Sequence, residues 1–193
     1  MGELKWPGEK CEDARVTAST ELYSDDTIPQ SLTWQALSFL RCEWPFLFAG
    51  SGRLRTRPFG GDGTTYVLRV EGGVLLSYAE VLQVTGTRDG EPVRVLGLSN
   101  VFTCPPYRNE GHASAIMDAV GGLINESQAE VAILFCEKEL EPFYAARGWH
   151  LATAASIQAP GTAPRTMVRS GPVGGEQLGA GLAATPVILD ARW

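Results

Sequence analysis

The change of pattern between residues 93 and 124 constrains the fold of this chain more than any other feature. Residues 93–103 are rich in Val, Leu and Phe and favour a strand, which ends at Pro105 because proline has no backbone N–H to donate. After Gly111, apolar residues return at intervals of three and four, the spacing of one helix face. These residues are Ala113, Ile116, Met117, Val120, Leu123 and Ile124. The sequence therefore predicts a strand, a short loop and a helix in immediate succession.

The loop and the first turn of this helix have the chemistry of an anion site. The first amides of a helix have no internal partner and carry partial positive charge, so residues 109–114 can bind a diphosphate without a lysine. Gly111 lets the backbone approach such a ligand closely, because glycine has no side chain. We therefore predict a diphosphate at this loop.

The residues before this unit predict a helix followed by a meander of strands. A strand over 14–22 and a helix over 29–40 precede an irregular aromatic segment over 42–63. Trp34, Leu37 and Leu40 are expected to face the core from this helix. Residues 65–71 and 74–85 are typical of a hairpin, and a turn at 88–91 leads into the strand 93–103. These strands are expected to be antiparallel.

After the predicted helix, the chain returns to the sheet. Residues 131–136 are a short apolar run that must cross back over the sheet and lie parallel to the strand 93–103. A helix over 140–147 follows, and the tail over 159–181 is rich in Gly, Pro and Ala and is expected to be loop. A last strand is expected at 186–189.

Length and charge narrow the class of protein. At 193 residues the chain suits a single domain over 1–193, able to remove about 70% of its unfolded surface from water. A formal net charge of −6 argues against a nucleic-acid partner, and no apolar stretch approaches a membrane span. Without the apolar run of a secretory signal, we expect a cytoplasmic location. The cysteines are widely spaced, so we expect reduced thiols and no bound metal.

Two motifs with a strand between them resemble those of the GNAT N-acetyltransferase superfamily. The first matches the family's acyl-CoA loop and consists of Pro105, Arg108, Gly111 and Ala113. The second matches a later helix and strand and consists of Phe143, Tyr144, Gly148 and Trp149. The resemblance implies the α/β acyl-CoA N-acyltransferase fold, a mixed sheet with splayed parallel central strands, and acetyl-CoA as cofactor.

The resemblance also implies how the cofactor binds. The pantetheine arm would enter the splay as a surrogate strand bonded to backbone groups, and the diphosphate would lie on the loop. The expected cofactor-binding residues are Val101, Phe102, Thr103, Arg108, Asn109, Glu110, Gly111, His112, Ala113 and Ser114.

Acid–base residues are implied only in part. By the resemblance, Tyr144 is the general acid that protonates the leaving thiolate. The amine must also lose a proton, and relatives often have a carboxylate where this chain has Ser99 and Asn100, which we expect at the acceptor. Glu80 and Glu137 are the alternatives for the base, although each is typical of a solvated strand residue.

The C-terminal part is similar to the aminoglycoside 2′-N-acetyltransferases. This resemblance rests on residues 144–149, residues 159–166 and the terminal Trp193. In that group, acidic residues and the C-terminal carboxylate receive a polycationic sugar, so Asp190 and Trp193 are expected at the acceptor. An acidic chain would also attract such a substrate.

The sequence therefore favours an enzyme that moves an acetyl group from acetyl-CoA to a primary amine of a small molecule, by direct attack in a ternary complex. Two alternatives stay open: an acyl-CoA-binding or sensing module without catalysis, and an acetyltransferase acting on protein N-termini or lysines. If the chain forms a homodimer, the aromatic segment 42–59 would supply the interface.

Overall fold

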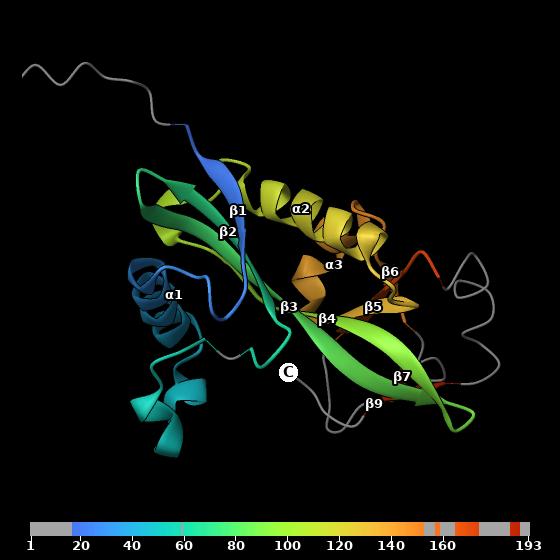
Figure 1. The fold of residues 1–193 in the computed structure, drawn as a ribbon. Helices are drawn as coiled ribbons and strands as arrows, with labels where there is room; N and C mark the ends of the chain where they lie inside the picture. The colour runs from blue at the N-terminus through green and yellow to red at the C-terminus, as the bar shows by residue number, and fades with distance from the viewer. Residues whose placement is uncertain (1–16, 59, 153–156, 159–164, 174–185, 190–193) are drawn as a thin grey trace, which may run out of the picture.

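The computed structural model describes residues 17–58, 60–152, 157–158, 165–173 and 186–189, which form a mixed sheet with helices on both faces (Figure 1). The strands are β1 (Ser19–Tyr23), β2 (Thr65–Glu71), β3 (Val74–Arg88), β4 (Glu91–Thr103), β5 (Val131–Cys136), β6 (His150–Leu151), β7 (Ile157–Gln158), β8 (Arg165–Ser170) and β9 (Val187–Leu189). The α-helices are α1 (Gln30–Glu43), α2 (His112–Glu126) and α3 (Glu141–Ala145). The short 3₁₀ helices are η1 (Pro45–Phe48), η2 (Gly50–Leu54), η3 (Pro105–Tyr107) and η4 (Lys138–Leu140).

The strand order is β1-β2-β3-β4-β5-β8-β6, with β9 paired to β3 and β7. The strands β1 to β4 are antiparallel, and β5 lies parallel to β4. The predicted meander and the predicted parallel crossover are both confirmed. The helix α2 makes this crossover, as a parallel connection requires.

Strand alternation divides the core between the two faces of the sheet. On one face, α1 packs Leu32, Ala36 and Leu40 against Tyr66 of β2 and Tyr78 of β3. On the other face, α2 packs its apolar stripe against the residues that alternate with these tyrosines, namely Val67, Ala79 and Val81. Because successive side chains of a strand point to opposite faces, each strand supplies both cores.

A third cluster closes the end of the sheet far from the loop after β4. It joins Val93 and Val95 of β4 to Val187 and Leu189 of β9. Gly86 leaves little room for a side chain, because a Cβ there would lie 3.1 Å from a methyl group of Val187. This close approach lets β9 pair with β3.

Several boundaries differ from those predicted. Strand β8 lies inside the segment predicted as loop, because pairing with β5 along Val131–Ser170 to Cys136–Arg165 overrides its Gly- and Pro-rich flanks. Trp34 is 45% exposed, because the buried stripe of α1 follows Leu32, Ala36 and Leu40 at intervals of four. The predicted helix 140–147 is α3 alone, preceded by the single turn η4.

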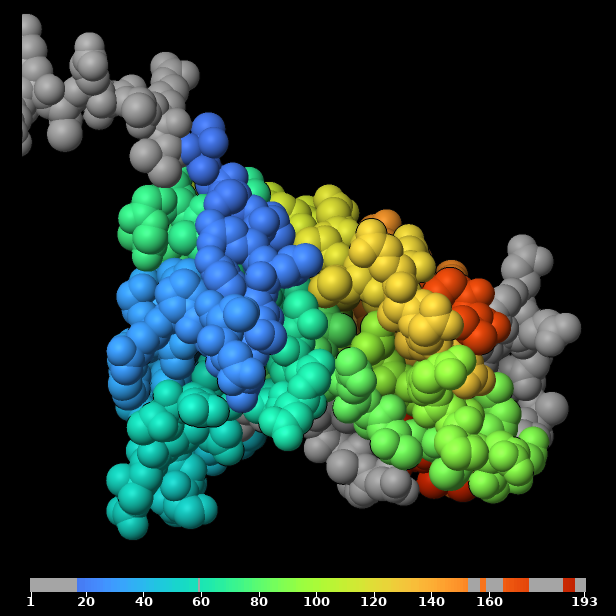
Figure 2. Space-filling view, in the orientation of Figure 1, coloured from blue at the N-terminus to red at the C-terminus, as the bar shows by residue number. Residues whose placement is uncertain are grey.

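The aromatic segment after α1 is irregular, as predicted, and only partly packed. Its two 3₁₀ helices project from the body of the molecule (Figure 2, teal), and Phe46 and Leu54 are 70% and 81% exposed. Trp44 and Phe48 pack against the core beneath α1, and the Arg41 guanidinium lies 5.0 Å from the Phe48 ring centre. The segment therefore attaches to α1 through only part of its aromatic side chains.

Candidate active site

The parallel strands β4 and β5 separate before β4 ends. Their pairing runs from Val95–Val131 to Leu98–Leu134, whereas β4 continues to Thr103. In the pairing of β3 with β4, Tyr78 lies opposite Phe102 and Glu80 lies opposite Ser99. One residue of β3 therefore faces two residues of β4, which defines a β-bulge in β4. Asn100 in this bulge has a positive φ of 51°. Past the bulge, β4 has no partner strand on its β5 side among the described elements.

The helix α2 begins immediately beyond this splay with an open N-terminus. Gly111 is its N-cap with a φ of 84°, no side chain caps the helix, and the first turn has no acidic residue. A Cβ built on Gly111 would meet no atom within 4 Å, so the backbone there faces open space. The first amides of α2 are therefore available to an outside acceptor.

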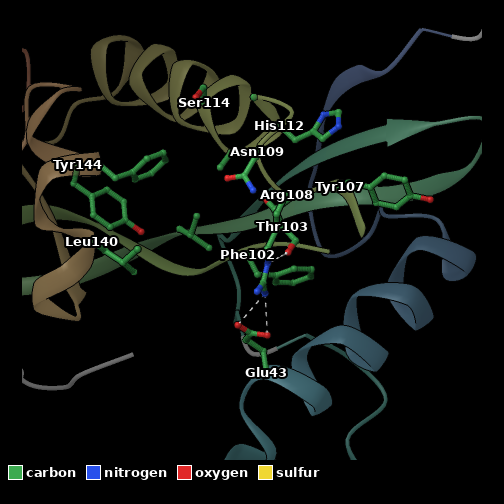
Figure 3. A pocket seen from close by; sticks show the side chains of 14 residues that line it. Glu43, Phe102, Thr103, Tyr107, Arg108, Asn109, His112, Ser114, Leu140 and Tyr144 are labelled. Carbon is green, nitrogen blue, oxygen red and sulfur yellow. Dashed lines mark hydrogen bonds and ion pairs between the residues drawn. The ribbon is translucent and has the colours of Figure 1, made fainter. Parts of the chain in front are cut away.

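A pocket of about 500 Å³ joins the splay to the start of α2 (Figure 3). It brings together most of the predicted cofactor residues and the predicted acid: Val101, Phe102, Thr103, Arg108, Asn109, Gly111, His112, Ala113, Ser114 and Tyr144. Glu110 does not line it, because its carboxylate turns to the His112 ring, with Oε2 3.3 Å from Nε2. The pocket is also lined by Glu43, Tyr107, Leu140 and Phe143.

Arg108 crosses one side of this pocket. Its Nε donates to the Thr103 carbonyl at 3.0 Å, and its Nη2 lies 3.2 and 3.3 Å from the two carboxylate oxygens of Glu43 (Figure 3). Arg108 thus connects the end of α1 with the end of β4.

Tyr144 lies on α3 at the other side of the pocket. Its side chain is 5% exposed, and in Figure 3 its hydroxyl points toward the middle of the pocket. Burial raises the pKa of Tyr144 well above its usual value, with a smaller contribution from Cys136. The rings of Phe143 and Trp149 contact it edge to face, with centroids 5.1 and 6.4 Å away. The phenol is therefore held in position and keeps its proton at neutral pH.

Glu80 is the carboxylate nearest in register to the bulge. It lies directly opposite Ser99 in the β3–β4 ladder, so the two side chains share the α1 face. The expectation of a solvated Glu80 is wrong: its exposure is 0%, because α1 and the tyrosines of the strands cover this face. The Tyr78 hydroxyl donates to Glu80 Oε1 at 2.7 Å, and burial followed by the Glu80 charge raises the pKa of Tyr78 well above its usual value.

The other predicted residues lie elsewhere. Glu137 is exposed at the end of β5 and does not line the pocket. Ser99 and Asn100 lie half-buried at the bulge, also outside the pocket lining. Asp190 and Trp193 lie outside the described residues.

Comparison with known proteins identifies the family. A model of the "Acetyltransferase (GNAT) domain" matches residues 21–152, more than half of the chain. The chain belongs to the GNAT acetyltransferase family. It is therefore an acyltransferase that uses acetyl-CoA.

Solved structures of other proteins share its fold at low sequence identity. Escherichia coli YhbS, crystallised with CoA, is 18% identical, with 92% of each chain covered and a TM-score of 0.60. Escherichia coli ElaA is 15% identical over 80% of this chain and 100% of its own, with a TM-score of 0.58. A GNAT acetyltransferase of Staphylococcus aureus Mu50 is 14% identical over 80% of this chain and 99% of its own, with a TM-score of 0.55. Among curated proteins, no significant match was found.

The site of this GNAT protein suits acetyl-CoA in two respects. Among the described residues, no side chain caps the start of α2, which offers amides to a diphosphate. The edge of β4 past the bulge, which no described strand pairs, offers backbone groups to an extended amide-containing arm. Both open into the same pocket. Within the described part of the chain, no helix is long and apolar enough to cross a bilayer.

Glu43, Tyr107, Leu140 and Phe143 line the pocket but were not predicted there from the sequence. Tyr107 and Phe143 stand inside the quoted motifs, and their spacing could have assigned them to the pocket. Glu43 could not be found in this way, because the predicted helix ended at Leu40 and only the folded α1 brings its last residue to Arg108.

Proposed function

We propose that this enzyme transfers the acetyl group of acetyl-CoA to the primary amine of a small molecule, by direct attack in a ternary complex formed in one domain over residues 1–193. The observation that supports this most is the position of the β4 bulge between two proton-bearing sites. The pocket containing Tyr144 lies on one side, and Glu80 lies opposite the bulge residue Ser99. Phe102 connects them, because it lines the pocket and stacks on Tyr78 with ring centroids 5.3 Å apart.

Tyr144 is the general acid of this proposal. Acetyl-CoA supplies an activated acetyl group whose leaving group is a thiolate. The Tyr144 hydroxyl retains its proton across the neutral range, since burial raises its pKa. It delivers that proton to the departing sulfur and is reprotonated from solvent.

Glu80 is the general base of this proposal. An ammonium must release a proton before its nitrogen can attack, and the nitrogen releases a second proton as the amide forms. In the overall reaction, the thiol that forms accounts for one proton, and the other passes through Glu80 to solvent. The register of Glu80 opposite Ser99 favours it over the exposed Glu137, because the neighbouring strand then supplies the carboxylate that β4 lacks.

The negative charge of the chain supports a cationic acceptor. A formal net charge of −6 attracts cationic amines, and the buried Glu80 carboxylate favours a cation at its position. More specifically, we propose polycationic aminoglycosides as acceptors. An enzyme for small molecules would not acetylate a peptide N-terminus or a lysine side chain.

Measuring release of CoA thiol from acetyl-CoA with a panel of amines tests the proposal. The panel contains simple diamines, an aminoglycoside, and peptides with a free N-terminus or lysine. We expect release with small amines and little with peptides, whereas the reverse order would overturn the acceptor class.

The variant Tyr144→Phe tests the acid. We expect kcat to fall by at least about 100-fold, because a positioned general acid contributes roughly 10²–10⁴ in rate. The dissociation constant for CoA, measured by calorimetry, should stay within about twofold, since the hydroxyl is one small part of the pocket. Tyr23→Phe on β1 is the matched control and should leave both quantities unchanged. An unchanged kcat in Tyr144→Phe would remove this residue from the mechanism.

A further inference from the structure

An arginine to which the sequence motifs assigned no role lies against the first turn of α2. Arg147 follows α3, and its Nη2 donates to the Ser114 hydroxyl at 2.6 Å. Ser114 lines the pocket from the start of α2. The Nη1 of Arg147 donates to the Phe143 carbonyl at 2.7 Å, and its guanidinium carbon lies 4.0 Å from the Phe143 ring centre. The guanidinium is therefore held between α3 and α2.

The positive charge of Arg147 lies beside the partially positive N-terminus of α2, so the two repel each other. The N-terminus of a helix carries partial positive charge and favours anions, so a cation there is unfavourable. Among the residues that the structure describes, no carboxylate lies within ion-pair distance of Arg147. The first turn of α2 contains no acidic side chain either. An anion bound at this turn would remove the repulsion between the two positive groups.

The same contact connects the two functional parts of the pocket. Arg147 lies one turn beyond Tyr144, and its backbone N–H donates to the Tyr144 carbonyl at 2.9 Å. Its side chain reaches the turn of α2 that faces the pocket. The side chain of Arg147 therefore links the first turn of α2 to the segment that carries Tyr144.

We propose that Arg147 is a positioning residue for the diphosphate of acetyl-CoA. It adds positive charge at the start of α2 through the Ser114 hydroxyl and holds α3 in place beside the bound diphosphate. This inference rests on the proposed function for the cofactor site, but it is independent of the acceptor.

Calorimetry with CoA and with 3′-dephospho-CoA, in the absence of any amine, tests the inference. For Arg147→Met we expect both dissociation constants to rise about tenfold, as expected when a charged hydrogen-bonding group is lost. Both probes contain the diphosphate, so the two factors should agree. The salt dependence of CoA affinity should also become shallower, because one cation fewer acts on the phosphates.

Two further variants separate charge from packing. Arg147→Lys keeps the charge and should stay within about threefold of the wild-type affinity. Arg169→Met is the matched control: Arg169 donates to the Arg147 carbonyl at 3.4 Å, but its other contact is Asn125 at the opposite end of α2. It should leave CoA affinity unchanged.

Three results would overturn the inference. They are an unchanged CoA affinity in Arg147→Met, a loss confined to CoA and absent with 3′-dephospho-CoA, and an equal loss in Arg169→Met. None of these depends on turnover, so a wrong acceptor assignment would not produce them.

Discussion

The two faces of strands β2 and β3 differ in chemistry although they share the same backbone. Toward α2 the strands present Val67, Ala79 and Val81, which are apolar and buried. Toward α1 they present Tyr66, Tyr78 and Glu80, which are equally buried but hydrogen-bonded. Burying a carboxylate is costly unless partners satisfy it, so the α1 face gives up stability that the α2 face does not. On these two strands, the apolar residues toward α2 therefore only pack, whereas the residues toward α1 include the proposed base Glu80.

At the splay of β4 from β5, residues of both face clusters line one pocket. The bulge at Asn100 ends the regular alternation of β4, and Phe102 packs with the α1 cluster although it lines the pocket at the start of α2. The proposed base Glu80 belongs to the α1 face and the proposed acid Tyr144 packs in the α2 cluster, so the proposal places the reacting group between them. We therefore expect that substituting Glu80 on the α1 face lowers kcat and leaves the fold intact, whereas truncating a packed residue of the α2 face lowers stability and leaves kcat intact.

The largest expected effect is that of Glu80→Gln. Removing the proposed base should lower kcat by about 10²–10⁴-fold at neutral pH, while the dissociation constant for CoA should stay within about twofold. Steady-state thiol release and calorimetry measure the two quantities. Gln keeps the acceptor oxygen for Tyr78, so the fold should persist.

Glu137→Gln is the control for this prediction. It removes the same charge from the exposed end of β5 and should change kcat by less than about twofold. If the two variants behaved alike, the α1 face would lose its assigned role in proton transfer.

On the opposite face, Ile124→Ala should give the reverse result. Ile124 is 1% exposed in the α2 core, so its truncation should lower the free energy of unfolding by about 2–5 kcal/mol. The kcat of the folded fraction should change by less than about twofold, because the residue lies at the far end of α2 from the pocket. Urea denaturation and thiol release measure the two quantities.

The exposed residue Glu126 on the same helix provides the comparison. Glu126→Ala should change unfolding by no more than about 0.5 kcal/mol. A large loss of kcat in Ile124→Ala at full folding would show that the α2 face is not purely structural.

The elements that were predicted correctly are those that short-range sequence spacing determines. The strand ending at Pro105, the helix stripe from Ile116 to Ile124 and the placement of Tyr144 on a helix near the loop follow from short-range spacing. The burial of Glu80 could not be predicted, because it depends on α1 covering the strand from another part of the sequence. The bulge at Asn100 likewise depends on the β3–β4 register, which spacing within β4 alone does not reveal.

Strand β8 was missed for a related reason. Residues 165–170 carry two arginines and follow a Gly- and Pro-rich stretch, so composition favoured a loop. Only Met167 and Val168 are buried in it, and the strand is stabilised by pairing with β5. Tertiary pairing therefore overrides local propensity here.

The smallest expected effect is a difference in alkaline stability between tyrosines of the two faces. Burial raises the pKa values of Tyr66, Tyr78 and Tyr144 above the usual value near 10. Below about pH 10 these phenols are protonated in both states and contribute no pH dependence. Above it the unfolded chain releases protons that the folded chain retains, so stability must fall as pH rises, by at most about 1.4 kcal/mol per pH unit for each tyrosine.

Tyr144→Phe and Tyr78→Phe should each flatten this decline by about one proton, since each removes one of these phenols. Urea denaturation between about pH 9 and 11.5 measures the slope. Burial also raises the pKa of Cys104, which titrates alike in all variants and cancels in the comparison. Burial raises the pKa of Cys136 too, but its charge acts on Tyr144, so all variants are compared in a Cys136→Ala background. The pH dependence contributed by the tyrosines of the two faces should differ when Glu80→Gln is combined with each tyrosine variant. Losing that charge lowers the pKa of Tyr78 but leaves Tyr144 unaffected, because Glu80 is not among the groups acting on Tyr144. The contributions of Tyr78 and of Tyr66, whose pKa the Glu80 charge also raises, should then shift to lower pH, whereas that of Tyr144 should not. An equal shift for Tyr78 and Tyr144 would mean that the two faces are electrostatically one environment.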